Sequence, residues 1–176
     1  MNGFIRPVRL DDAERVASIY NRYVSKTTIT FETESVPVEV MRGRIDSISS
    51  VFPYFVYEYD DEVLGYCYAH LWKEREAYSK TLETTVYLAP EACHKGIGQL
   101  LMTHLIDECR RQCYHALIAC ITADNLSSLQ FHHRLGFRQV SRFSEVGRKQ
   151  HRFRRGERPC QPPPLRCRHR DPLRSP

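Results

Sequence analysis

Apolar residues recur along the chain with two periods, one typical of helices and one typical of strands. The first segment, Phe4–Leu10, alternates as a strand does, and Asp11 or Asp12 is suited to cap the helix that follows. Ala13–Ser25 has a helical stripe of apolar residues, and a second helix is predicted to begin near Pro37. The stretch between these helices is rich in Thr and has no helical period, so we expect a loop there.

The middle of the chain predicts a hairpin and a third strand. Tyr54–Tyr59 and Val63–Trp72 read as strands that are joined by a turn at Asp60–Asp61. Thr81–Leu88 alternates in the same way and stops before Pro90. These segments favour antiparallel pairing.

Helices and strands alternate in the second half. We predict a helix over Gly96–Gln112, a buried strand over His115–Thr122, a short helix over Leu126–Leu135 and a last strand near Arg138–Glu145. Such alternation implies partly parallel pairing. The fold class expected is therefore α/β, with a mixed, mostly antiparallel sheet that is flanked by helices on both faces.

Composition narrows the class of protein. A chain of 176 residues with 41% hydrophobic and 27% charged residues can form one packed domain, which excludes wholesale disorder. No apolar run reaches the length of a membrane span, and the N-terminus lacks the layout of a signal peptide. The seven Cys include no C-x-x-C pair, so we expect reduced thiols, no metal site and a cytoplasmic location.

The net charge of +5 belongs to the end of the chain. Residues 150–176 contain eight Arg, two acidic residues and six of the ten Pro, whereas residues 1–149 are almost neutral. We therefore predict a folded domain over 1–149 and a basic, Pro- and Arg-rich disordered tail over 150–176. Because Phe153 is the tail's only aromatic residue, the tail is poorly suited to stacking on RNA, and nucleic acid is not the expected partner.

A glycine-containing segment, Cys93-His94-Lys95-Gly96-Ile97-Gly98, separates a predicted strand from a predicted helix. Glycines allow a ligand to approach the backbone, and the N–H groups and dipole at a helix start attract anions. Lys95 adds a positive charge, so a pyrophosphate is the natural ligand, although such glycines also serve as simple turns. The segment has neither a P-loop ending nor the three-glycine dinucleotide pattern.

This segment resembles the coenzyme A pyrophosphate loop of the GCN5-related N-acetyltransferases (GNAT), whose pattern is Gln/Arg-x-x-Gly-x-Gly/Ala. Gly96 and Gly98 match the pattern, and Cys93 occupies the position of Gln or Arg, so one donor to the phosphates is absent. Further motifs, in the same order, resemble the phosphinothricin N-acetyltransferase branch across roughly residues 3–149. They are IRP, TFETE at 30–34, GYCYA at 65–69, KEREAY at 73–78, LETTVYLAP at 82–90 and FHHRLGF at 131–137.

The resemblance implies an acetyl-CoA-dependent N-acetyltransferase that acts on the amine of a small amino-acid-like molecule. Phosphinothricin, methionine sulfoximine and methionine sulfone are the substrates of this type. One alternative is acetylation of a protein N-terminus or lysine. An alternative from another class is a catalytically impaired or polyanion-binding protein that acts through its basic tail.

The resemblance also implies roles for single residues. Glu83 matches the strand glutamate that serves as base, and His132 stands where many relatives carry a tyrosine that protonates the leaving thiolate. Alternatively, Glu83 is a solvated strand residue and His132 is packed between apolar neighbours. Asn125 resembles the residue that binds the coenzyme arm, and it is also a suitable helix cap.

Two further groups of residues carry binding roles by resemblance. The coenzyme is expected to contact the main chain of Val86, Tyr87 and Leu88, and the loop of His94, Lys95, Gly96, Ile97, Gly98 and Gln99. The acceptor pocket is expected to contain Phe31, Glu32, Arg75 and Tyr78, where the Arg75 fork suits a carboxylate or phosphinate. The resemblance also implies a homodimer, with loops from both subunits near the site.

The resemblance stops after residues 146–149. Relatives continue there with an aromatic-rich final strand, whereas this chain continues with Arg, Pro and Cys. We expect the final strand to be disrupted, which exposes a sheet edge. A reading-frame or splicing variant of an ancestral strand is our hypothesis for the origin of the tail.

Overall fold

A computed structural model describes residues 3–143 and Lys149. Its centre is a five-stranded sheet whose strands follow chain order, β1-β2-β3-β4-β5. The first four strands pair antiparallel, and β5 lies parallel to β4. The bounds are Phe4–Pro7 for β1, Tyr54–Tyr59 for β2, Glu62–Leu71 for β3, Thr81–Leu88 for β4 and Ala116–Ile118 for β5.

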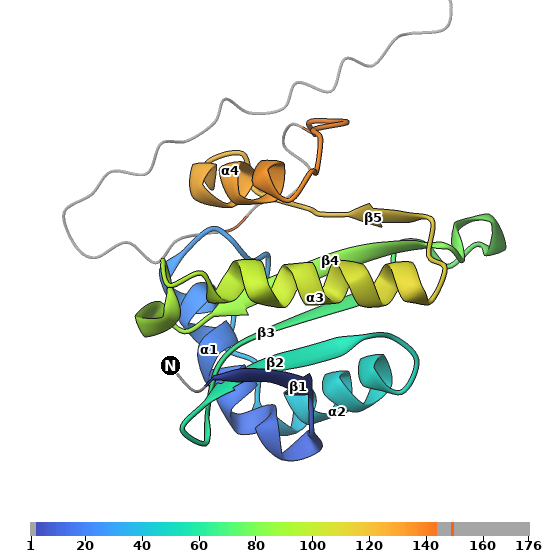
Figure 1. Ribbon diagram of the computed structural model, residues 1–176. Helices are drawn as coiled ribbons and strands as arrows, with labels where there is room; N and C mark the ends of the chain where they lie inside the picture. The colour runs from blue at the N-terminus through green and yellow to red at the C-terminus, as the bar shows by residue number, and fades with distance from the viewer. Residues whose placement is uncertain (1–2, 144–148, 150–176) are drawn as a thin grey trace, which may run out of the picture.

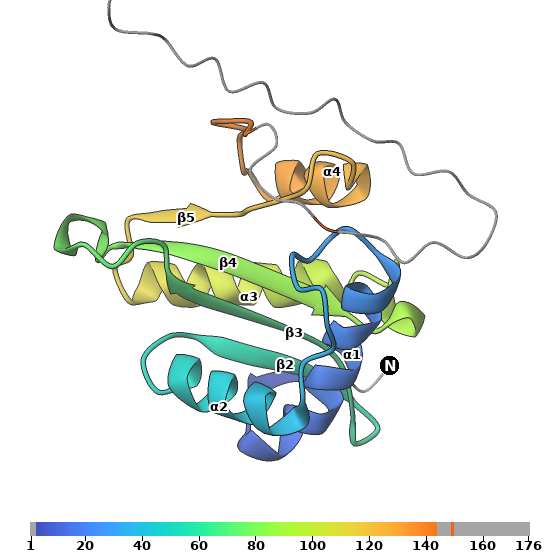
Figure 2. The same cartoon turned by 180° about the vertical axis from the view of Figure 1, so that it is seen from behind.

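Helices cover both faces of this sheet. The helices α1 (Ala13–Lys26) and α2 (Val38–Ser49) lie on one face, and α3 (Ile97–Arg111) lies on the other (Figures 1 and 2). The short helix α4 (Leu126–Arg134) lies beyond β5. The prediction of a mixed, mostly antiparallel sheet between helical layers is thus confirmed.

The core consists of one continuous cluster on both faces of the sheet. On α3 the buried residues recur at helical spacing, as the sequence pattern requires. On β3 almost every position is at least half-buried, because both faces of this central strand are covered. The largest fully buried side chains include Tyr66, Ile19, Ile45, Leu82, Leu101, Met102 and Leu105.

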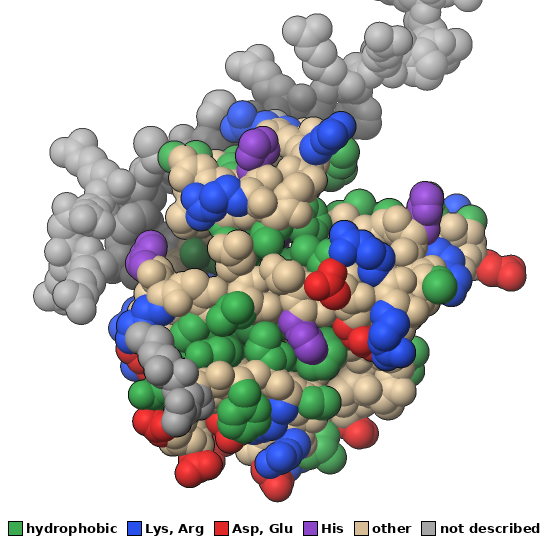
Figure 3. Space-filling view, in the orientation of Figure 1, with side chains coloured by type: hydrophobic (Ala, Val, Ile, Leu, Met, Phe, Trp, Pro, Cys, Tyr) green, Lys and Arg blue, Asp and Glu red, His purple; other side chains and the backbone are tan. Residues whose placement is uncertain are grey.

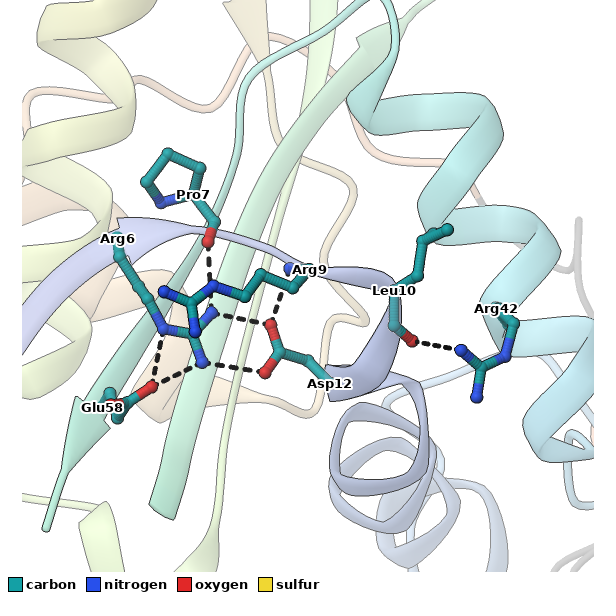
Figure 4. A network of polar contacts seen from close by, with 7 residues as sticks. All are labelled: Arg6, Pro7, Arg9, Leu10, Asp12, Arg42 and Glu58. Atoms are coloured by element: carbon teal, nitrogen blue, oxygen red, sulfur yellow. Dashed lines mark hydrogen bonds and ion pairs between the residues drawn. The ribbon is translucent and has the colours of Figure 1, made fainter. Parts of the chain in front are cut away.

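A buried ionic cluster joins β1 and β2 to the start of the first helix. The Arg6 guanidinium donates to both carboxylate oxygens of Asp12 at 2.8 Å and to Glu58 at 2.6 Å (Figure 4). All three side chains are at most 14% exposed. Burial alone would raise the pKa of Asp12, but Arg6 and the Arg9 N–H outweigh it and hold that pKa below its ordinary value.

Some predicted elements differ from those observed. The predicted strand over His115–Thr122 forms only at Ala116–Ile118 and is half-buried, because the chain leaves β4 after that point. Residues 138–143 form no strand, and residues 144 and 145 lie outside the described residues. The final strand and the tail over 150–176 also lie outside them. No helix in the described ranges is long and apolar enough to cross a bilayer.

Candidate active site

The pairing between the parallel strands β4 and β5 ends at Glu83. Their last paired positions are Glu83 and Ile118, but β4 continues through Leu88. Beyond the pairing, the Thr84 hydroxyl donates to the carbonyl of Ile118 at 3.2 Å. The main-chain groups of residues 85–88 on that side of β4 are therefore not paired with β5. An extended ligand can hydrogen-bond to such an open strand edge.

The glycine-containing loop lies at the far end of β4. Gly96 has a φ of 80° and forms the start of α3 with no side chain that caps the helix. A Cβ at Gly98 would lie 3.3 Å from Leu88 Cδ1 and 3.6 Å from Phe131 Cζ. The backbone of α3 thus approaches both β4 and α4 closely, and its first N–H groups have no intrahelical partners. A recess with hydrophobic side chains at its floor separates α4 from this end of α3 (Figure 3).

The helix α4 carries the candidate acid. Asn125 caps the helix, because its side-chain oxygen accepts from the Ser128 N–H at 3.2 Å. His132 is 6% exposed and lies edge-on to the rings of Phe131 and Phe137. Its Nδ1 lies 2.9 Å from the Ser128 carbonyl, which can only accept, so Nδ1 carries the hydrogen and Nε2 is left as an acceptor. Burial lowers the pKa of His132.

Glu83 points away from the α3 face of the sheet. Its neighbours Leu82 and Thr84 are buried, whereas the Glu83 side chain is 25% exposed. The Oε2 atom of Glu83 lies 4.0 Å from Nε2 of His70 on β3. Loss of water around the Cys120 thiol and the nearby charge of Glu83 raise the pKa of that thiol to about 11. The carboxylate thus lies where β3, β4 and the segment after β5 meet.

A hollow of about 400 Å³ lies along the Thr-rich loop and the first half of α2. Phe31 is 61% exposed there, and Glu32 forms an ion pair of 2.6 Å with Arg44 of α2. Lys149 donates to the main-chain carbonyl of Thr30 at 3.0 Å. The hollow therefore contains an exposed aromatic ring and a partly exposed guanidinium, with an ammonium group beside the loop.

Comparison with known proteins decides the family. The Acetyltransferase (GNAT) domain matches residues 5–153. The chain belongs to the GNAT acetyltransferases. It is 37% identical over 153 residues to phosphinothricin N-acetyltransferase of Streptomyces coelicolor, which covers 85% of this chain and 90% of the relative. It is 30% identical over 139 residues to the L-methionine sulfoximine/L-methionine sulfone acetyltransferase of Salmonella typhimurium, which covers 78% of this chain and 81% of the relative.

Solved structures agree with the fold of this acetyltransferase. A phosphinothricin acetyltransferase from Sinorhizobium meliloti in complex with acetyl-CoA superposes with a TM-score of 0.81 at 30% identity, over 87% of this chain and 84% of that one. The ribosomal-protein-alanine N-acetyltransferase of Brucella melitensis superposes with the same TM-score at 31% identity, over 83% and 91% of the chains.

The residues of the acetyltransferase fit a coenzyme A thioester on three observations. The open edge of β4 provides main-chain partners, and the uncapped start of α3 provides donors for phosphate. The Thr122 hydroxyl, just before α4, is buried without a hydrogen-bond partner among the described residues. A ligand that lies between β4 and α4 would supply such a partner. The described residues contain no group of three or more His, Cys, Asp or Glu that could hold a metal ion.

The predicted site residues do not all lie together in one copy of the acetyltransferase. Val86, Tyr87 and Leu88 lead to the loop of residues 94–99, which in turn approaches α4. Arg75 and Tyr78 lie in the connection between β3 and β4, at the opposite end of the sheet from the Thr-rich loop in both views (Figures 1 and 2). One chain therefore does not join them to Phe31 and Glu32.

Residue-by-residue inspection of the sequence missed three side chains near this site. Arg44 is the partner of Glu32, His70 lies opposite Glu83, and the Tyr23 hydroxyl donates to the Leu88 carbonyl at 2.7 Å. The hairpin-like pattern could have located His70, because antiparallel strands over 62–71 and 81–88 place it near Glu83. Nothing local indicates Arg44 or Tyr23, which meet the site through tertiary packing.

Proposed function

We propose that this protein transfers the acetyl group of acetyl-CoA to the α-amine of a small amino-acid-like molecule of the phosphinothricin, methionine sulfoximine or methionine sulfone type. The observation that carries the proposal is the parting of β4 from β5 at Glu83, with the glycine helix start at the other end of the open edge. This arrangement provides a long, narrow binding edge that has a carboxylate at one end and anion-binding groups at the other.

The chain's own residues would hold the coenzyme as follows. The main chain of Val86 and Leu88 pairs with the amides of the pantetheine arm, and Asn125 and Thr122 face it from the other side of the opening. The N–H groups of residues 96–99 and the Lys95 ammonium bind the pyrophosphate. When bound, acetyl-CoA supplies a thioester carbonyl that an unprotonated amine can attack, with a thiolate as leaving group.

Two side chains handle protons in this proposal. Glu83 takes a proton from the ammonium form of the substrate, which is needed because amines are mostly protonated at neutral pH. His132 supplies a proton to the departing thiolate. Because the lowered pKa of His132 favours its neutral form, Nε2 first accepts the proton that the attacking nitrogen loses as the amide forms, and His132 then passes that proton to the thiolate.

The acceptor would lie in the hollow beside the Thr-rich loop. Phe31 covers the side chain of the substrate, and Arg44 is placed to bind its carboxylate in competition with Glu32. Arg75 and Tyr78 would reach this hollow from a second copy of the chain, since they lie at the opposite end of the sheet in their own copy. The proposed assembly is thus a homodimer. The proposed location is the cytoplasm.

One observation favours a second candidate function. The Brucella melitensis protein, which shares 31% identity and the fold, is named a ribosomal-protein-alanine N-acetyltransferase. Acetylation of a protein N-terminus would require the hollow to admit an extended peptide. The exposed Phe31 at its rim leaves the hollow open to such a chain.

The test is release of free thiol from acetyl-CoA with three amines: phosphinothricin, methionine sulfone and a peptide that begins with alanine. N-acetylphosphinothricin, which has no free amine, is the matched control substrate. We expect saturable turnover with at least one small amine and none with the control. Turnover with the peptide alone would replace the proposal by the second candidate, and no turnover with any amine would refute both.

A further inference from the structure

Glu83 has a histidine partner that the family pattern does not assign. His70 and Glu83 are directly paired positions of β3 and β4, so their side chains leave the sheet on the same face. The two side chains are partly exposed, at 36% for His70 and 25% for Glu83. Nε2 of His70 lies 4.0 Å from Oε2 of Glu83. The imidazole is therefore the basic group across the strand from the proposed base.

The other ring nitrogen fixes the state of this imidazole. Nδ1 of His70 lies 3.1 Å from the main-chain carbonyl of Leu71. A carbonyl only accepts hydrogen bonds, so Nδ1 carries the hydrogen of the neutral ring. The lone pair of Nε2 then faces the carboxylate. Such a lone pair is well placed to take a proton from Glu83 once the carboxyl group is protonated.

Tyr68 and Cys120, which also lie near the carboxylate, keep their protons near neutral pH and so do not accept one from Glu83. Tyr68 lies next to His70 on the same face of β3, and burial above all raises its pKa. Loss of water and the charge of Glu83 raise the pKa of Cys120 to about 11. The Lys73 ammonium lies near this thiol and acts in the opposite direction. Among these neighbours, histidine is the residue type that changes charge between pH 5 and 8.

We propose that His70 is a positioning residue that acts through Glu83: its Nε2 takes the proton that Glu83 has removed from the substrate amine, and the ring carries that proton to solvent. This inference rests on the proposed function of Glu83 as base. The proton leaves the ammonium nitrogen of the substrate for Glu83, then passes to Nε2 of His70, and the imidazolium releases it to water. Glu83 returns to its charged form, and no other reactant is consumed.

The experiment measures kcat and KM from pH 5.5 to 9 for the full chain, for the double variant of His70 and Glu83, and for three single variants. They are His70→Gln, Glu83→Gln and, as a control, the exposed His115→Gln. We expect His70→Gln to lower kcat at least tenfold and to flatten its pH profile, with the KM for acetyl-CoA unchanged. The double variant of His70 and Glu83 is expected to be no slower than Glu83→Gln alone, because both changes remove one proton route.

Rescue and spectroscopy separate this role from simple loss of structure. Added imidazole is expected to restore part of the activity of His70→Ala. Nitrogen-15 NMR of the neutral ring in the wild-type chain is expected to show the hydrogen on Nδ1. A hydrogen on Nε2 overturns the proposal, even if the variants fail to fold.

The outcomes for the two proposals differ. If Glu83→Gln lowers kcat and His70→Gln does not, the role of His70 is refuted and the proposed function stands. If Glu83→Gln has no effect, Glu83 is not the base and the role of His70 is refuted with it. A change confined to the KM for the amine would make His70 a substrate contact and would also refute the positioning role.

Discussion

Replacement of Arg6 by Met tests whether the ionic cluster stabilises the junction of β1, β2 and the first helix. The substitution removes the only cation that contacts both Asp12 and Glu58 in the described structure (Figure 4). Methionine keeps much of the side-chain volume. Two carboxylates that are 9% and 14% exposed are then left without their partner. The substitution should lower the unfolding free energy, because the charges of Asp12 and Glu58 are then buried without a cation.

Loss of one partner of a buried ion pair costs about 3–5 kcal/mol of unfolding free energy. Because the side chains of this cluster retain some exposure, we expect a value near the lower end, about 3 kcal/mol. For a chain of this size, each kcal/mol lowers Tm by about 2–4 °C, so the expected decrease is about 6–12 °C. Asp11→Asn is the control, since its side chain is 98% exposed and we expect a change below about 0.5 kcal/mol.

The pH dependence gives a second, independent readout of the same change. The pKa of Asp12 is lowered in the folded state, so its stabilising effect is present above its unfolded pKa and is lost as pH falls through the lower, folded value. Arg6→Met removes this effect, so the cost of the substitution should shrink once pH falls below the ordinary Asp pKa of 3.8. Urea unfolding of the wild type and Arg6→Met at several pH values measures this difference in unfolding free energy. A cost below 1 kcal/mol at pH 7, or one that is constant with pH, would refute the reasoning.

Three further predictions concern the acetyltransferase site. Cys93→Arg introduces the donor that the GNAT pattern expects. One charge-assisted hydrogen bond should lower the KM for acetyl-CoA by roughly tenfold, whereas Cys93→Ser should leave it unchanged. An unchanged KM for Cys93→Arg in initial-rate assays would contradict this. Glu83→Gln removes the charge that helps to raise the pKa of Cys120. Iodoacetamide should therefore alkylate Cys120 several-fold faster at pH 8 in this variant than in the wild type, as measured by peptide mass spectrometry. Equal alkylation rates would show that the charge of Glu83 does not affect the thiol. Burial lowers the pKa of His132, so its neutral form stabilises the fold above the unfolded pKa of about 6.5 and this effect is lost as pH falls. His132→Phe should therefore lose less stability between pH 7 and pH 5 than the wild type does in urea unfolding, and equal losses would count against a neutral, buried imidazole.

Strong local patterns allowed much of the fold to be predicted from sequence. The bounds of β2 and β4 match their prediction, because alternation and the Asp60-Asp61 turn act within short segments. Helix α3 begins and ends within one residue of expectation, although its apolar residue Leu100 is 54% exposed. Leu100 lies at the edge of the apolar stripe of α3. The helical period does not tell which edge of that stripe contacts the sheet, because this depends on how the neighbouring elements pack.

Local sequence patterns could not predict where the pairing between β4 and β5 ends. Residues after Ile118 are as apolar as those before it, so periodicity extends the strand, whereas pairing depends on how far the partner strand stays adjacent. The same limit applies to Arg75 and Tyr78, whose motif is recognisable but whose place relative to the Thr-rich loop is a property of the fold or of an assembly. Recognition of motifs thus predicts the residue types of a site better than it predicts their contacts.

The central claim is that Glu83, at the point where the two strands part, removes the proton that blocks acetyl transfer. Its most direct test is kcat at pH 7.5 for acetylation of the preferred small amine by Glu83→Gln, compared with the exposed control Glu14→Gln. We predict a decrease of about 10²–10⁴-fold for Glu83→Gln, the range typical of a lost general base, with the KM for acetyl-CoA within twofold of the wild type. A kcat for Glu83→Gln within about threefold of the control would contradict the claim.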